Sequence, residues 1–155
     1  MADNASLLTD VAIELRHAEL RPVYGVRSER RSVALAQGPR TVVDLGTTDG
    51  LPNLGQAIAM RLLTPRGELA ELGHPEYGSR LHELIGSANT ENRRSMTKLF
   101  VLESLAQEPR IEKIVRCDVA PAPGTRDRVN VELEVKPVAS VETVTVGPFT
   151  LTFAP

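Results

Sequence analysis

The stretch VNVELEV at residues 129–135 alternates an aliphatic with a polar side chain at every position. Because successive side chains of a β-strand point to opposite faces of its sheet, this pattern predicts a strand with one buried and one wet face. Alternation returns at residues 144–153, on both sides of Gly147 and Pro148, a pair typical of a bulge. With a further strand expected from Ile114 to Val119, the C-terminal third predicts an antiparallel meander.

Upstream of the meander the sequence period becomes helical. The longest helix is expected to have Asn89 or Thr90 as its N-cap and Glu91 in its first turn, and Pro109 stops it. Its expected inward face consists of Met96, Leu99, Leu102, Leu105 and Ala106. An earlier helix should begin near Pro52 and end before Pro65, and Ser79 can cap a short helix over residues 80–85.

The sequence pattern of the first 50 residues predicts secondary structure less clearly. Residues 7–20 fit both a helical and a strand spacing, and residues 21–50 indicate turns around short extended pieces, with 41–45 as the best strand. We therefore expect an α+β fold: two to three helices packed on a C-terminal antiparallel β-meander, with short N-terminal extended segments. Residues 1–40 are interpreted as an extension that docks a partner or stays mobile, and residues 41–155 as the main domain.

The amino-acid composition argues against several classes of function. The chain has 155 residues, of which 41% are hydrophobic but only 3% aromatic, so we expect an aliphatic core and no aromatic carbohydrate cleft. A net charge of −2 with interspersed signs argues against a nucleic-acid partner. The single Cys117 predicts a buried small hydrophobe, and no stretch resembles a secretory signal or a membrane span, so a cytoplasmic origin without membrane insertion is expected.

No common catalytic or cofactor motif is complete. His82 and Glu83 begin a zinc-protease pattern, but Gly86 stands where its second histidine belongs. The phosphate-binding, dinucleotide-binding and hydrolase motifs are absent, so we expect no metal, no cofactor and no catalysis. Paired carboxylates remain an alternative, since glycoside hydrolysis needs only two suitably spaced acids. The candidates are Glu68, Glu71, Glu76, Glu83 and Glu108.

Three stretches together resemble the baseplate sheath-initiator family of contractile phage tails, type VI secretion systems and extracellular injection systems. They are LLTPRGE at 62–68, HPEYGSRL at 74–81 and EPRI at 108–111. The resemblance implies a non-catalytic structural subunit, part of a phage tail-like particle, with one copy per wedge of a hexameric baseplate. The implied partners are wedge proteins, the sheath protein and the inner tube or hub proteins.

The resemblance also implies two binding surfaces. Glu108, Pro109 and Arg110 would contact the wedge core, although a helix-capping role in which the two charges pair with each other is open. The last strands would template the sheath by strand addition. The residues concerned are Val129, Val131, Leu133, Val135, Val144, Val146, Phe149, Leu151 and Phe153. A peptidoglycan-cleaving enzyme and a generic strand-addition adaptor are the alternatives from other classes.

Overall fold

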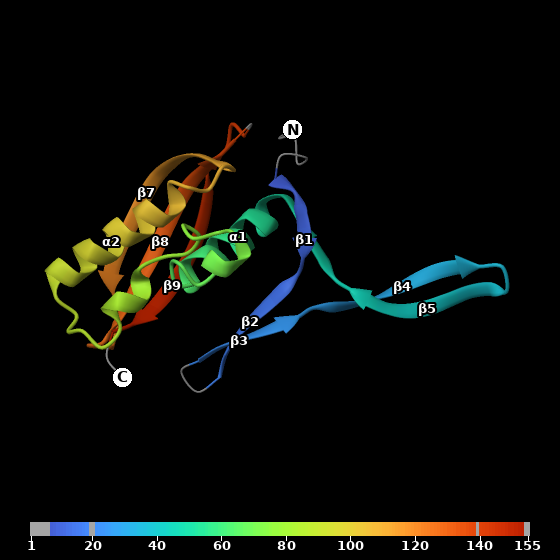
Figure 1. The fold of residues 1–155 in the computed structure, drawn as a ribbon, viewed down its shortest axis with the longest axis horizontal. Coiled ribbons are helices and arrows are strands. Elements are labelled where there is room, and N and C mark those ends of the chain that lie inside the picture. The colour runs from blue at the N-terminus through green and yellow to red at the C-terminus, as the bar shows by residue number, and fades with distance from the viewer. Residues whose placement is uncertain (1–6, 19–20, 139, 154–155) are drawn as a thin grey trace.

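The computed structural model describes residues 7–18, 21–138 and 140–153. Figure 1 shows a body of helices and sheet from which paired strands project. The projecting part contains β1 (Thr9–Val11), β2 (Ile13–Ala18), β3 (Arg21–Val26), β4 (Ser28–Leu35), β5 (Gly38–Leu45) and β6 (Thr47–Asp49). The body contains α1 (Gly50–Leu63), the short 3-10 helices η2 (Ala70–Leu72) and η3 (Leu81–Leu84), α2 (Glu91–Leu105), β7 (Ile111–Pro121), β8 (Arg128–Pro137) and β9 (Val144–Thr152). The expected α+β fold is confirmed.

The C-terminal meander forms a three-stranded antiparallel sheet with β8 in its centre. The alternation along β8 is confirmed, because its four aliphatic side chains are buried while the residues between them are only half-buried. The predicted bulge is also present: the register between β8 and β9 shifts opposite the cis Gly147–Pro148 bond.

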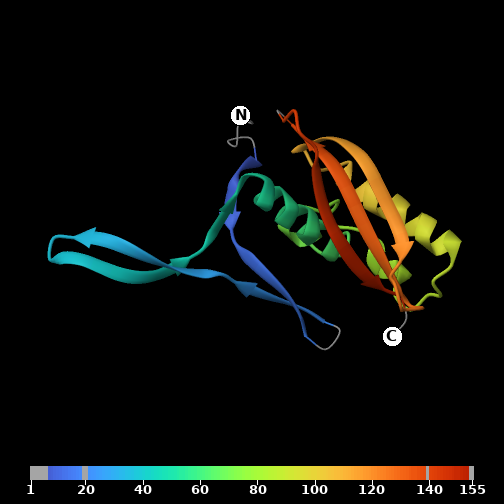
Figure 2. The same cartoon turned by 180° about the vertical axis from the view of Figure 1, so that it is seen from behind.

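Both helices lie on one face of this sheet, as Figures 1 and 2 show from opposite sides. The core between them is aliphatic apart from Phe100 and Phe153, and it includes the buried Cys117 as expected. On the other face charged residues stand in water, where Arg116 pairs with Asp118 and Glu132 at 2.9 and 3.4 Å. The sheet is therefore covered by helices on one side only.

The inward face of α2 differs from the expectation. Leu105 is buried and Met96 and Leu102 are half-buried, but Leu99 is 59% exposed and Ala106 is exposed. The face that reaches the core consists of Thr97, Phe100, Val101, Ser104 and Leu105. Two of these are hydroxyl residues whose side chains donate to backbone carbonyls, so apolar spacing alone could not find them. The expected N-cap is confirmed at Thr90, whose Oγ1 accepts from the N–H of Arg93 at 3.3 Å.

A close backbone contact fixes the segment between the two helices. After α1 ends, Ser79 N–H donates to Thr64 O and Arg66 N–H donates to Ser79 O, both at 2.8 Å. Ser79 Oγ also donates to Leu62 O and accepts from Leu81 N–H. The expected helix is the 3-10 helix η3, and its N-cap is Arg80 without a side-chain cap bond, so the prediction of Ser79 as the cap is wrong. Gly78 has a φ of +106°, and a Cβ there would lie 2.5 Å from Thr64 O.

The N-terminal region forms more regular strands than expected. Thr9–Val11 and Ile13–Ala18 are strands, and β4 and β5 pair over eight residues each. Since β5 runs through residues 40 and 41, the expected domain boundary falls inside a hairpin, and the helical body follows β6.

Three two-stranded ladders, β1–β6, β2–β3 and β4–β5, meet at a backbone junction. Ala12 N–H donates to Gly46 O at 2.8 Å, Gly46 N–H to Arg27 O at 2.7 Å, and Arg27 N–H to Ala12 O at 2.9 Å. Each residue is both donor and acceptor, so the ring leaves none of these N–H groups without an acceptor where the ladders separate.

We predict that Gly78→Ala lowers the free energy of unfolding by about 3 kcal/mol, because the new Cβ adds a backbone clash to an unfavourable φ. Gly73→Ala is the matched control. Its φ is +88° but nothing lies within 4 Å of the added Cβ, so about 1 kcal/mol is expected. Urea denaturation followed by circular dichroism measures both, and equal losses would contradict the clash.

Candidate functional site

The corner between α2 and β7 contains the first group of sequence-predicted residues. Glu108 N–H donates to Leu105 O at 3.0 Å and Ile111 N–H donates to Glu108 O at 3.1 Å, which turns the chain from helix to strand around Pro109. Pro109 is exposed and Arg110 is half-buried, whereas Glu108 is only 6% exposed. The predicted corner is confirmed, but its three residues differ in how far a partner could reach them.

Glu108 lies in a buried ion cluster that ties three elements together. Arg110 Nε donates to Glu108 Oε1 at 2.7 Å, and Arg61 Nη2 from α1 lies 3.5 Å from Glu108 Oε2. The Arg61 guanidinium in turn lies over the Tyr77 ring, 4.5 Å from its centroid. The pairing of Glu108 with Arg110, left open by the sequence, is therefore present, and the carboxylate is engaged within its own chain.

The electrostatics of the cluster favour an ionised carboxylate. Burial would raise the pKa of Glu108, but the hydrogen bond from Arg110 and the charges of Arg110 and Arg61 together lower it below its ordinary value. Burial raises the pKa of the neighbouring Tyr77 hydroxyl. The cluster is thus a fixed salt bridge at neutral pH.

Arg61 is the residue of this cluster that sequence reasoning missed. It is 8% exposed, and its Nε has no hydrogen-bond partner among the described residues. One signal was available in the sequence. Arg61 follows Ile58 by three positions on the apolar stripe of α1, and a charged side chain that is buried on such a stripe needs a partner of opposite charge. A shallow hollow of about 330 Å³ opens beside it, with Tyr77 and the segment from Gly73 to Glu76 in its wall.

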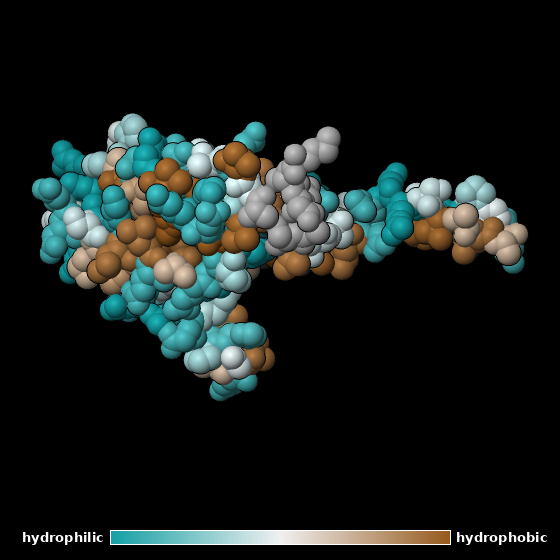
Figure 3. Space-filling model, turned by 90° about the horizontal axis from the view of Figure 1, so that it is seen from above, coloured by the Kyte–Doolittle hydropathy of each residue, from teal (hydrophilic) through white to brown (hydrophobic). Residues whose placement is uncertain are grey.

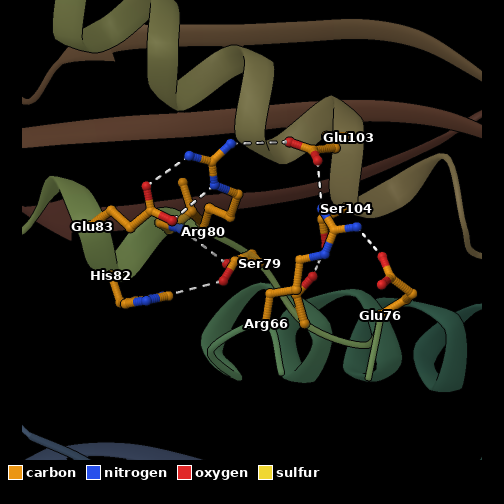
Figure 4. Close-up of polar contacts among 10 residues, drawn as sticks. Arg66, Glu76, Ser79, Arg80, His82, Glu83, Glu103 and Ser104 are labelled. Carbon is orange, nitrogen blue, oxygen red and sulfur yellow. Dashed lines mark hydrogen bonds and ion pairs between the residues drawn. The ribbon is translucent and has the colours of Figure 1, made fainter. Parts of the chain in front are cut away.

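A second set of ion pairs links the loop after α1 to η3 and α2, as Figure 4 shows. Arg66 pairs with both Glu76 and Glu103, and Arg80 Nε donates to Glu83 at 2.8 Å. Arg80 also lies over the Phe100 ring. These contacts join the loop after α1, η3 and α2 into one surface.

The carboxylates proposed for glycoside hydrolysis are arranged unfavourably for that chemistry. Glu68 and Glu71 are exposed, and Glu76, Glu83 and Glu108 are paired with arginines. A general acid for this reaction needs a raised pKa. Hydrogen bonds from Arg80 lower the pKa of Glu83, and that of Glu108 is lowered as well.

The strands proposed for strand addition separate into one central and one edge strand. Both edges of β8 are already paired, so Val129, Val131, Leu133 and Val135 contribute to the core and not to an open edge. In β9, Val146 is buried and Val144, Phe149 and Leu151 are half-buried; Phe153, directly after the strand, is buried. Within the described residues, no strand pairs with the outer edge of β9.

The backbone of β9 shows which groups face that edge. Phe153 N–H donates to Asp127 O at 2.7 Å, toward β8. Because N–H groups alternate sides along a strand, those of Thr152 and Thr150 point away from β8. The opposite edge strand, β7, has two register shifts and several charged residues, features that discourage pairing. β9 has one register shift, at Gly147 and Pro148, and no charged residue, so its regular edge lies after Pro148.

No described group of three or more His, Cys, Asp and Glu side chains is close enough to hold a metal ion. None of the helices in the described ranges is both long and apolar enough to cross a bilayer.

No family model matches the chain, and no curated protein matches it significantly. Among solved structures, it is similar to a crystal structure from Geobacter sulfurreducens of a protein provisionally named a tail lysozyme. The TM-score is 0.52 at 19% sequence identity, and the match covers 66% of this chain and 89% of the other. At that identity the two chains share a fold, and the likeness by itself assigns no activity.

We predict that Glu108→Gln lowers the free energy of unfolding by about 3 kcal/mol at pH 7, because two arginines lose a buried counter-charge. The folded-state pKa of Glu108 is lowered, so its contribution is complete above the unfolded value of about 4.3 and is lost as the pH falls through the folded value. The difference between wild type and variant should therefore narrow below about pH 4.

Chemical denaturation at a series of pH values checks this prediction. The control is Glu83→Gln, which removes an exposed carboxylate that also pairs with arginine and should change the free energy of unfolding far less. A pH-independent difference for Glu108→Gln would show that the carboxylate is not ionised in the folded protein.

Proposed function

We propose that this chain is a non-catalytic structural subunit of the baseplate of a phage tail-like contractile machine. Its corner around Glu108 binds the wedge core, and its last strand templates the sheath. The observation that carries the proposal is the uncharged edge of β9, which no strand pairs with in the described part of the chain, in a fold shared with a protein provisionally named a tail lysozyme. The three sequence stretches that resemble sheath initiators support the same reading.

At the proposed wedge-core surface, Glu108 and Arg110 have different roles. Glu108 is held inside, so it positions Arg110 and does not itself reach a partner. Arg110 uses Nε for Glu108, and its two terminal nitrogens have no side-chain acceptor within the described residues. A planar guanidinium with free N–H groups beside an exposed Pro109 suits bidentate pairing with a carboxylate or with backbone carbonyls of a partner.

At the sheath surface, the outward N–H groups of Thr150 and Thr152 allow an incoming strand to pair with β9. Backbone pairing would supply affinity, and the half-buried side chains would fix the register. This assigns sheath templating to β9, with β8 supporting it from within the sheet.

The ion-paired acids and lowered pKa values argue for a structural role over peptidoglycan cleavage. Clearing of cell wall by the purified, folded chain on a zymogram would contradict the proposal.

We predict that Arg110→Ala abolishes incorporation into baseplates, since it removes the guanidinium from the corner. The body should stay folded but lose stability, because Glu108 keeps only Arg61 as a charged partner, and circular dichroism of the purified variant checks the fold. Incorporation is measured by quantitative mass spectrometry of particles purified from the producing cells. The matched control, Lys113→Ala, removes an exposed charge three residues further along β7 and should incorporate normally. Wild-type levels of Arg110→Ala in particles would refute the assigned surface.

We predict that Thr150→Pro blocks sheath growth, because it removes an N–H from the free edge without removing one from the β8–β9 ladder. Thr150→Ala is the matched control. It loses the same hydroxyl, which donates to Asn130 Oδ1 at 3.0 Å, but it retains the N–H. Electron microscopy should show sheathed particles for the alanine and unsheathed baseplates for the proline; sheaths on both would exclude strand addition at this position.

A further inference from the structure

The hairpin formed by β4 and β5, here called the β4–β5 arm (residues 28–45), has no core of its own. Its side chains are exposed, with only Val33 and Gly38 half-buried. Val43 is 72% and Leu45 is 54% exposed. Figures 1 and 2 show the arm extending away from the body, and Figure 3 shows hydrophobic side chains along it.

An isolated two-stranded hairpin is at best marginally stable in water. This arm has an added unfavourable contact, because Glu29 lies directly opposite Asp44, and like charges in that position destabilise a strand pair. Exposed aliphatic groups on both faces give it no internal compensation. The arm therefore gains much of its stability only when another chain covers it.

The charge of the arm indicates which kind of chain this is. The arm contains Arg30, Arg31 and Arg40 against Glu29 and Asp44, a net charge of 3 − 2 = +1, so the rest of the chain carries −2 − 1 = −3. The two acids lie opposite each other at the base of the arm, and the part beyond them, residues 30–43, contains the three arginines and no Asp or Glu. This basic part would attract an acidic strand more strongly than it would attract a second arm.

The two edges of the arm are not equivalent. β5 contains Pro39, which has no N–H, while every residue of β4 has one. The outer edge of β4 has no strand partner among the described residues. An added strand along β4 could therefore pair without interruption.

We propose that the β4 edge of this arm is a docking site for an extended segment of a partner protein that alternates acidic and aliphatic residues and adds as a third strand. Because successive side chains of a strand point to opposite faces, the acidic side chains would lie on the face of Arg30 and pair with it, and the aliphatic ones would lie on the other face and cover Val33 and Leu35. The site is separate from the Arg110 corner and from β9, so it gives the subunit a third attachment, independent of the function proposed above.

The test uses the purified full chain and three fluorescein-labelled peptide probes, TEVEVEVT, TKVKVKVT and TEVEPEVT, in fluorescence anisotropy. The acidic probe should bind at least about ten-fold more tightly than the basic probe, by charge, and than the proline probe, by loss of strand pairing. A variant carrying Arg30→Glu, Arg31→Glu and Arg40→Glu should reverse the preference between acidic and basic probes. Hydrogen exchange should show protection of β4 amides by the acidic probe.

Equal affinity for the three probes, or an unchanged preference in the charge-reversed variant, would overturn the proposal. Sedimentation of the chain alone gives a further decisive outcome: a dimer that the charge reversal dissociates would identify the occupant as a second copy. Circular dichroism confirms that the variant keeps its body folded. Because no baseplate component is used, failure here leaves the proposed function untouched.

Discussion

The buried carboxylate of Glu108 is the contact on which the arrangement of the body depends. It receives Arg61 from α1 and Arg110 from the start of β7 while its own backbone closes the turn after α2. A carboxylate buried at this depth would be costly without such partners, and each arginine would be costly without the carboxylate. The cluster therefore constrains the relative position of α1, the corner and the sheet, because both ion pairs of Glu108 form only when these parts are in place.

This ion cluster illustrates which parts of the structure the sequence could predict and which it could not. The meander follows from a period of two along β8, and the corner follows from Pro109, because both are local rules. Arg61 could not be assigned to Glu108, since the pair joins positions 47 residues apart by the packing of α1. The face of α2 was misassigned because hydroxyl residues are buried on it: Thr97 donates to Arg93 O within the helix, and Ser104 donates to Gly78 O, which only the folded chain brings close.

The N-terminal strands present the opposite case, in which local pairing exists without packing. Leu7 packs in the core of the body, but β1 and β2 beyond it are held by backbone bonds and by the junction of Ala12, Arg27 and Gly46. Gly46 fits this junction because an added Cβ would lie 3.2 Å from both the Arg27 side chain and its carbonyl oxygen. A junction made from backbone groups leaves few sequence signals apart from a glycine, which is why the long hairpins were not expected.

The two proposed strand-addition edges differ in what binding would cost. The β9 edge belongs to a sheet already ordered by the core, so an incoming strand pays mainly for its own ordering. The β4 edge belongs to an arm with no core, and its partner must also stabilise the arm. Affinity at β4 should therefore be lower for the same number of backbone bonds, unless charge complementarity offsets the difference. A subunit with these two edges would hold a growing polymer firmly through β9 while its arm engages a specific acidic neighbour.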